Sequence, residues 1–173
     1  MLRVGVLTGG GDSPGINAAI RSIVRFGSRN SVDVVGFLEG WRGPMENLTR
    51  PLTPQDVSGI LHIGGTILGS SRTNPFRVDG GPTQVVDTLR ANGIDALIAI
   101  GGDDTLGVAH RLAEHGVHAV GIPQTIDNDI YLTDYSLGFS SALGVITDAL
   151  DRLHTTAASH HRVLILEVMG RDA

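Results

Sequence analysis

The chain has 173 residues, 41% of them hydrophobic and 18% charged, which is enough for one domain with a real core and hardly enough for two. It contains no cysteine, which excludes a disulfide scaffold, a thiol nucleophile and a cysteine–zinc site. A net charge of −5 argues against nucleic-acid and membrane-surface partners. Because there is no signal-peptide pattern and no apolar run near the roughly 20 residues of a membrane helix, we expect a cytoplasmic protein.

The beginning of the chain predicts a strand, a glycine loop and a helix in succession. A short buried strand is expected over 3–7, and Gly9, Gly10 and Gly11 follow it. Apolar residues at helical spacing predict an amphipathic helix over 16–26. Because the N–H groups of such a loop and of a helix N-terminus bind anions, we interpret this segment as a phosphate site. A tight turn is the alternative, although a turn alone needs fewer glycines.

The next part of the chain predicts a second strand over 32–38 and a short helix over 54–63. Trp41 lies between them and either stacks on a ligand ring or, as is more common, covers the edge of the core. A second loop rich in glycine and hydroxyl residues spans 64–75 and contains Arg72. An arginine among small donors suits phosphate charge, and an ordinary surface arginine is the alternative.

A second succession of strand, glycines and helix follows. A helix is expected over 82–92 and a buried strand over 96–100, which leads into the sequence GGDDT at 101–105 and then into another helix. An acidic pair does not bind phosphate directly, but a divalent cation between Asp103 and a phosphate would explain it. Helix N-capping by aspartate is the alternative, and it accounts for one Asp more easily than for both.

The apolar run at 119–122 predicts a buried strand that ends in the sequence PQTIDND at 123–129. Thr125, Asp127 and Asp129 then lie just beyond the end of the strand. In an open parallel sheet, ligands bind outside the carboxyl ends of the strands. A carboxylate pair at that position suits a general base or a magnesium site.

The last part of the chain predicts its longest helix over 140–158 and another buried strand over 163–168, with MGR following at 169–171. Strands thus alternate with helices, which predicts an α/β fold with a Rossmann-like parallel sheet and flanking helices. Glycine, hydroxyl, Asp or Arg residues follow most of these strands. We therefore expect one site along the carboxyl edge of the sheet.

Four motifs together resemble the 6-phosphofructokinase family over essentially the entire chain: TGGGDSPGIN at 8–17, GGDDT at 101–105, PQTIDND at 123–129 and MGR at 169–171. The resemblance implies the phosphofructokinase fold, with 1–138 as an incomplete donor-binding domain and 139–173 as the start of a truncated sugar-phosphate domain. It implies glycolytic phosphoryl transfer to the 1-hydroxyl of fructose 6-phosphate with Mg²⁺, from ATP or pyrophosphate. Full-length members are expected to be homo-oligomers.

The resemblance also implies roles for individual residues. Asp127 is the expected base, with Thr125 and Arg171 assisting in catalysis, and Asp103 is the expected magnesium ligand. The implied donor-binding residues are Gly11, Arg72, Gly102, Asp103, Asp104 and Gln124. The implied substrate-binding residues are Thr125, Asp127, Asp129, Arg162, Met169, Gly170 and Arg171, with Arg162 reaching the sugar phosphate of a neighbouring subunit.

The chain departs from the family pattern at the donor site and at the effector site. The resemblance implies a small residue at position 104 and Gly at position 124 for members that use ATP. For members that use pyrophosphate it implies Asp at position 104 and Lys at position 124. Asp104 together with Gln124 leaves the donor open, since Asp104 crowds an ATP α-phosphate and Gln124 lacks a cation. Arg21 and Arg25 match family effector arginines, but Pro54 does not, so allosteric control is not expected.

Length is the third departure, because family members are much longer than this chain. We therefore expect a fragment that is inactive alone and is poorly stable or prone to aggregate, since an incomplete sheet exposes edges and apolar faces. The alternative function is a non-catalytic nucleotide- or phosphate-binding remnant, or a partner of a full-length homologue. An NAD-binding domain is disfavoured because the strict glycine fingerprint is absent.

Overall fold

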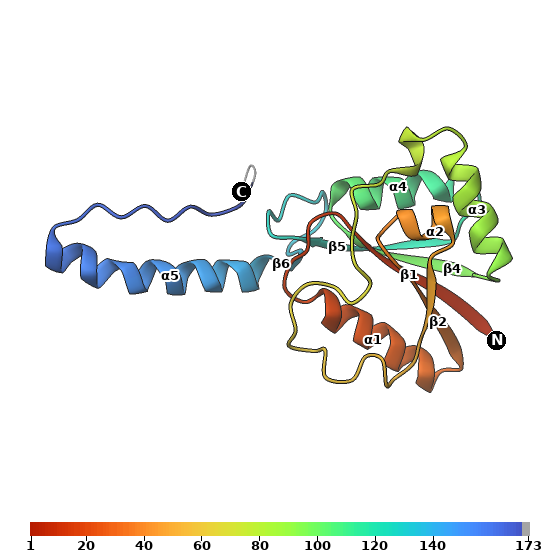
Figure 1. Cartoon of the computed structure of the whole chain (residues 1–173), viewed down its shortest axis with the longest axis horizontal. Coiled ribbons are helices and arrows are strands. Elements are labelled where there is room, and N and C mark those ends of the chain that lie inside the picture. The colour runs from red at the N-terminus through yellow and green to blue at the C-terminus, as the bar shows by residue number, and fades with distance from the viewer. Residues whose placement is uncertain (171–173) are drawn as a thin grey trace.

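A computed structural model of the chain, which describes residues 1–170, has one central sheet with helices on both faces (Figure 1). The six strands lie in the order β3-β2-β1-β4-β5-β6. Their bounds are Leu2–Gly9 (β1), Val32–Phe37 (β2), Thr49–Leu52 (β3), Ala96–Gly101 (β4), Ala119–Thr125 (β5) and Leu137–Gly138 (β6). All neighbouring strands are parallel except β2 and β3, so the prediction of an α/β fold with a mostly parallel sheet is confirmed.

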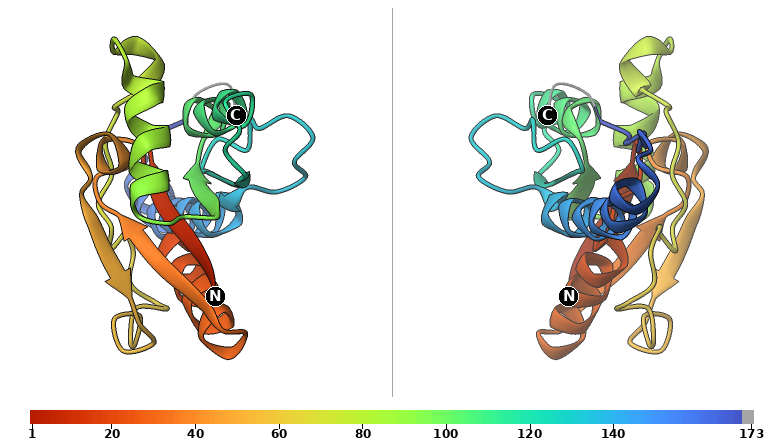
Figure 2. Two further views of the ribbon diagram at one scale, coloured as in Figure 1. Left: turned by 90° about the vertical axis from the view of Figure 1, so that its right-hand side faces the viewer. Right: turned by 90° about the vertical axis from the view of Figure 1, so that its left-hand side faces the viewer.

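Within residues 1–170, four α-helices and one 3₁₀ turn lie between strands, and a fifth α-helix follows β6. Their bounds are Ile16–Arg29 (α1), Arg42–Glu46 (α2), Gly81–Ala91 (α3), Asp103–Ala113 (α4), Phe139–His160 (α5) and Pro75–Arg77 (η1). Figure 2 shows α1 on one side of the sheet and α3 on the other. The helices expected over 16–26, 82–92 and 140–158 are therefore present as α1, α3 and α5.

Two clusters of buried side chains lie on opposite faces of the sheet. Val4 and Val6 of β1 point toward α1 and pack with Ile16 and Ile20, while Leu7 packs on the other face with residues of α3 and α4. Successive side chains of a strand alternate between faces, so a short apolar strand serves both clusters. This double cover fixes β1 and β4 at the centre of the sheet, and their carboxyl ends are positioned accordingly.

One expectation for the first half of the chain is wrong, and one pair of alternatives is decided. Residues 54–63 form turns instead of a helix, although Val57 and Ile60 still bury their side chains. Gly59 has a φ of +75°, which is incompatible with a right-handed helix at that residue. Trp41 is 1% exposed and packs in the core beside α3, so the ligand-stacking alternative is excluded and Trp41 is a core residue.

The strand expected at 119–122 is present as β5, but it continues to Thr125 and is not buried. Val120 is 59% exposed. The reason is that β6 pairs only with Gln124 and Thr125, so the first residues of β5 form an open edge of the sheet. The functional motif therefore begins inside the strand and not after it.

The strand expected at 163–168 is absent: residues 162–170 have no regular secondary structure, and Val163 and Ile165 are 92% and 90% exposed. A continuous apolar run forms a buried strand only where both faces are covered, and within residues 1–170 nothing covers this one. Helix α5 likewise buries none of its residues and projects from the sheet (Figure 1). The exposed apolar side chains of 163–168 and of α5 are the expected starting points of aggregation. Aggregation and the domain boundary near 138 both stay predictions.

Candidate active site

The loops after β1, β4 and β5 meet around one cavity of about 610 Å³ at the carboxyl edge of the sheet. Its walls are formed by Gly10, Gly11, Asp12, Arg72, Gly102, Asp103, Asp104, Thr105, Gln124, Thr125, Ile126, Asp127, Asp129, Met169 and Gly170. This is the edge at which open parallel sheets bind ligands.

The cavity brings together the residues expected from the sequence, with two exceptions. Arg162 is exposed and does not line it, and Arg171 lies outside the described residues. Asp12, Thr105 and Ile126 also line the cavity, although no role was assigned to them from the sequence. Asp12 could have been identified from the sequence, because it is an acidic residue directly after three glycines.

The first glycine loop is held by its neighbours in the fold. Gly10 has a φ of +80°; its N–H donates to the carbonyl of Ser71 at 3.3 Å, and its own carbonyl accepts from the Ser70 hydroxyl. The Ser13 hydroxyl donates to the carbonyl of Leu137 at 2.9 Å. These bonds connect the loop to the segment that carries Arg72 and to the residues just before α5.

Gly101 ends β4 where the backbone of β1 approaches closely. A Cβ at this position would lie 2.6 Å from the carbonyl oxygen of Gly9 and 2.7 Å from the Cβ of Thr105. Real Cβ atoms do not approach that closely, so glycine is required here for packing, independently of any ligand. Gly102 has an ordinary backbone conformation, and a Cβ there would make only an ordinary contact, 3.7 Å from the carbonyl oxygen of Gln124.

Gln124 is the buried polar residue of the cavity wall. Its side chain is 1% exposed, and its Nε2 donates to the carbonyl oxygen of Gly11 at 3.2 Å. Its Oε1 is buried and has no hydrogen-bond partner within residues 1–170. An unpaired buried acceptor is costly, and a water or ligand in the cavity that Gln124 lines would satisfy it.

Asp103 and Asp104 form the first turn of α4, and the N-cap residue is Gly102. N-capping by either aspartate is therefore excluded, although both charges are favourable next to the N-terminal end of the helix dipole. Within residues 1–170 the Asp103 carboxylate has no hydrogen bond or ion pair, whereas Asp104 Oδ1 accepts from Asn74 Nδ2 at 3.0 Å and lies 3.6 Å from the Arg77 guanidinium.

The turn after β5 is fixed by local hydrogen bonds. The N–H of Asp127 donates to the hydroxyl of Thr125 at 3.0 Å, and the Ser136 hydroxyl donates to the carbonyl of Thr125 at 2.7 Å. Asn128, which has a φ of +53°, accepts from the N–H of Ser136 at 2.8 Å. Asp127 is half-buried at the centre of this turn, so its position relative to the glycine loops is well defined.

The charge of the cavity wall is predominantly negative. Asp12, Asp103, Asp104, Asp127 and Asp129 line it, and Arg72 is the cation among its described lining residues. A phosphate would be repelled by these carboxylates unless a divalent cation intervened. No group of three potential metal-ligating side chains exists within residues 1–170. Magnesium usually takes one or two carboxylates together with substrate phosphates and water, so the residues present fit that ion.

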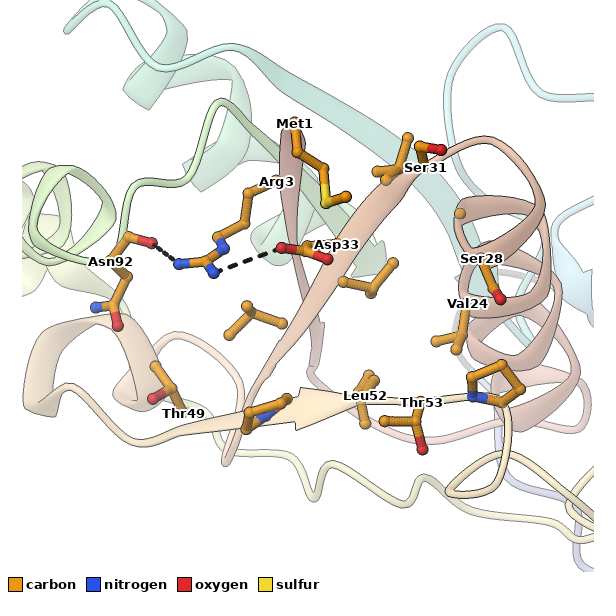
Figure 3. A pocket seen from close by; sticks show the side chains of 16 residues that line it. Met1, Arg3, Val24, Ser28, Ser31, Asp33, Thr49, Leu52, Thr53 and Asn92 are labelled. Atoms are coloured by element: carbon orange, nitrogen blue, oxygen red, sulfur yellow. Dashed lines mark hydrogen bonds and ion pairs between the residues drawn. The ribbon is translucent and has the colours of Figure 1, made fainter.

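A second cavity, of about 600 Å³, lies at the opposite edge of the sheet (Figure 3). There the guanidinium of Arg3 donates to the carbonyl of Asn92 at 3.0 Å and contacts Asp33 at 3.5 Å. The charged groups of this wall thus pair with one another, and the glycine loops are distant from it. The candidate active site is therefore the cavity at the carboxyl edge.

Fold and site together define an α/β protein with glycine-rich, carboxylate-bearing loops at the carboxyl edge of a parallel sheet. The model of the phosphofructokinase family matches residues 3–173, and the chain belongs to this family. The family expected from the sequence motifs is thereby confirmed.

Named relatives use different phosphoryl donors. The chain is 58% identical to the pyrophosphate–fructose 6-phosphate 1-phosphotransferase of Amycolatopsis mediterranei, and it is 51% identical to the ATP-dependent 6-phosphofructokinase of Mycobacterium leprae; each match covers 99% of this chain and 51% of the relative. The chain thus spans about half the length of these relatives. The solved structure of phosphofructokinase from Saccharomyces cerevisiae matches with a TM-score of 0.88 at 35% identity, over 99% of this chain and 26% of that one.

None of the helices described within residues 1–170 is both long enough and apolar enough to cross a membrane.

Proposed function

We propose that this chain forms the donor-binding side of a phosphofructokinase that transfers a phosphoryl group to the 1-hydroxyl of fructose 6-phosphate. The observation that carries the proposal is the single cavity in which two glycine loops, Arg72, Asp103 and Asp127 converge from loops far apart in the sequence. Phosphoryl transfer depends mainly on positioning and charge neutralisation, and this set of groups provides both.

Each group has a distinct proposed role. The glycine-loop N–H groups and Arg72 bind the phosphate oxygens of the donor, and Asp103 is the carboxylate that would hold Mg²⁺, which neutralises phosphate charge when bound. Asp127 accepts the proton of the sugar hydroxyl, a role supported by its position on the wall of the same cavity as the glycine loops. Thr125, Asp129, Met169 and Gly170 line the sugar side of the same cavity.

Pyrophosphate is the proposed donor. The Asp104 carboxylate is held at the cavity wall by Asn74 and Arg77, where it would crowd and repel the additional phosphate of ATP. Gln124 is uncharged and its amide donates to Gly11, so position 124 does not by itself select between the two donors. Relatives named as pyrophosphate-dependent are 51% to 59% identical to this chain, compared with 47% to 51% for relatives named as ATP-dependent.

A second candidate is a phosphate-binding protein without turnover of its own. The observation in its favour is that the sugar side is less complete than the donor side: Arg162 lies outside the cavity, and α5 buries no residue. The role of Arg162 at a neighbouring subunit, and the homo-oligomer that it requires, stay predictions.

An activity assay combined with calorimetry distinguishes the two candidates. Formation of fructose 1,6-bisphosphate is followed in a chimera in which this chain replaces the matching half of the Amycolatopsis mediterranei relative, with fructose 6-phosphate, Mg²⁺ and either pyrophosphate or ATP. Pyrophosphate binding to the chain itself is measured separately. Turnover with pyrophosphate supports the first candidate. Magnesium-dependent binding without turnover supports the second, and the absence of both contradicts the two candidates together. Asp103→Asn is the control, because it should abolish the magnesium-dependent signal in either case.

A further inference from the structure

Two residues outside the cavity hold Asp104 in place. Asn74 Nδ2 donates to Asp104 Oδ1 at 3.0 Å, and Arg77 Nη2 lies 3.6 Å from the same oxygen. Neither Asn74 nor Arg77 belongs to the cavity wall, whereas Asp104 does. Their contacts with the Asp104 carboxylate connect these two residues to the cavity.

The orientation of the Asn74 amide is fixed from its other end. Asn74 is the N-cap of η1, and its Oδ1 accepts from the N–H of Phe76 at 3.0 Å. This bond leaves Nδ2 as the atom that faces Asp104. One side chain thus caps a turn with its oxygen and binds the carboxylate with its nitrogen.

Helix α4 is attached to the same turn at a second point. The guanidinium of Arg111, in the last turn of α4, lies 3.6 Å from the centre of the Phe76 ring, and the His115 ring lies 5.9 Å from it. The segment of Asn74–Arg77 thereby contacts α4 near both of its ends. Because Asn74 is held by these other contacts, its hydrogen bond restricts the rotation of the Asp104 side chain, and Asn74 does not move with Asp104.

Magnitude decides which contact matters more. Arg77 and Asp104 have side chains that are 76% and 59% exposed, and exposed ion pairs contribute little. The bond from Asn74 is exposed as well, but it is shorter and comes from an amide whose orientation is held by the N–H of Phe76, which makes it the stronger constraint. Asn74 is therefore the principal residue that holds Asp104, and Arg77 assists it.

We propose that Asn74, assisted by Arg77, is a positioning residue that sets donor specificity by holding Asp104 against the cavity. This inference rests on the proposed function. A held Asp104 carboxylate remains in the path of the third phosphate of a nucleoside triphosphate. Pyrophosphate is shorter and does not require the carboxylate to move. A released carboxylate rotates toward solvent and reduces the discrimination.

The test is a double-mutant cycle read out by calorimetry on the 173-residue chain. The affinities of magnesium pyrophosphate and of a magnesium complex of a non-hydrolysable ATP analogue are measured for the parent chain, Asn74→Ala, Asp104→Gly and the double variant. Asn74→Ala should raise the ratio of nucleotide affinity to pyrophosphate affinity about fivefold, the effect of losing one solvent-exposed hydrogen bond. In the Asp104→Gly background the same substitution should leave the ratio unchanged.

Asn74→Asp provides a second variant in case the alanine variant loses the turn. It retains an acceptor for the Phe76 N–H, lacks the amide donor and repels Asp104, so it should shift the ratio in the same direction. An unchanged ratio in both variants overturns the inference, and so does an equal change with and without Asp104, because that would report a general loosening of the loop. If neither donor binds the parent chain, the proposed function fails and this inference with it.

Discussion

The buried amide of Gln124 donates a hydrogen bond from Nε2 to the carbonyl oxygen of Gly11 at 3.2 Å. The bond joins the end of β5 to the first glycine loop, across 113 positions of the sequence. Position 124 therefore acts on the loop that is proposed to bind the donor, and its effect on donor binding is expected to be indirect.

Replacing Gln124 by methionine should weaken both the loop and the site. Methionine has a similar volume but no donor, so the free energy of unfolding should fall by about 1 kcal/mol and pyrophosphate affinity by about fivefold. Urea denaturation and calorimetry measure the two quantities. Gln84→Met, at an exposed position on α3, is the matched control and should change neither. An unaltered affinity in Gln124→Met would show that the bond to Gly11 does not organise the donor loop.

The two adjacent glycines at the end of β4, Gly101 and Gly102, should differ in their response to alanine. A Cβ at Gly101 would lie 2.6 Å from the Gly9 carbonyl oxygen, so Gly101→Ala should cost about 2 kcal/mol or more of unfolding free energy. At Gly102 the nearest atom would be 3.7 Å away, so Gly102→Ala should stay within about 0.5 kcal/mol of the parent. Equal losses in a denaturation experiment would contradict the packing account of the Gly101 position.

Asp127 is expected to be the base of the transfer reaction, and its replacement by serine tests this. The variant is best made in a chimera in which this chain replaces the matching half of the Amycolatopsis mediterranei relative. Turnover should fall by about 10²-fold to 10⁴-fold, with the KM for fructose 6-phosphate changing much less. Asp134→Asn, in the exposed part of the following loop, is the control. A loss smaller than about tenfold would exclude Asp127 as the base.

The turn over 53–56 should give a weak acid-dependent contribution to stability. Hydrogen bonds from the Thr53 hydroxyl and N–H, with a smaller contribution from Arg50, lower the pKa of Asp56 from its ordinary value of 3.8. A carboxyl whose pKa is lower in the folded state stabilises the fold above pH 3.8, and that contribution disappears as the pH falls through the lowered pKa. Asp56→Asn should therefore flatten the pH dependence of unfolding below about pH 4. An unchanged acid limb would contradict this.

The site at the carboxyl edge of the sheet was predictable because each strand that contributes to it is followed in the sequence by glycine or aspartate residues. Glycines and aspartates directly after apolar runs identified Gly11, Asp103 and Asp127 without knowledge of the packing, since parallel strands bring their carboxyl ends to one edge. The contact between Asn74 and Asp104 was not predictable, because it depends on how two loops 30 positions apart meet in space.

The edges of the sheet were the least predictable part of the fold. Strand β3 contains Pro51, and it has no alternating apolar pattern from which it could have been predicted. It pairs only with β2, and at this edge position the missing N–H donor of the proline is tolerated. The apolar run at 163–168 had the opposite problem: its composition favours a strand, but without cover on either face it stays exposed. Composition reports preference, and only packing decides whether a segment becomes a strand.

The most direct test of the central claim is a titration of the chain with pyrophosphate in the presence and absence of Mg²⁺, using calorimetry. The proposal that the carboxyl-edge cavity is a phosphoryl-donor site predicts binding that requires Mg²⁺, is lost in Asp103→Asn and is weakened at least about tenfold in Arg72→Ala. Binding that persists without Mg²⁺ and is unaffected by either substitution would place the anion elsewhere on the molecule and would contradict the proposal.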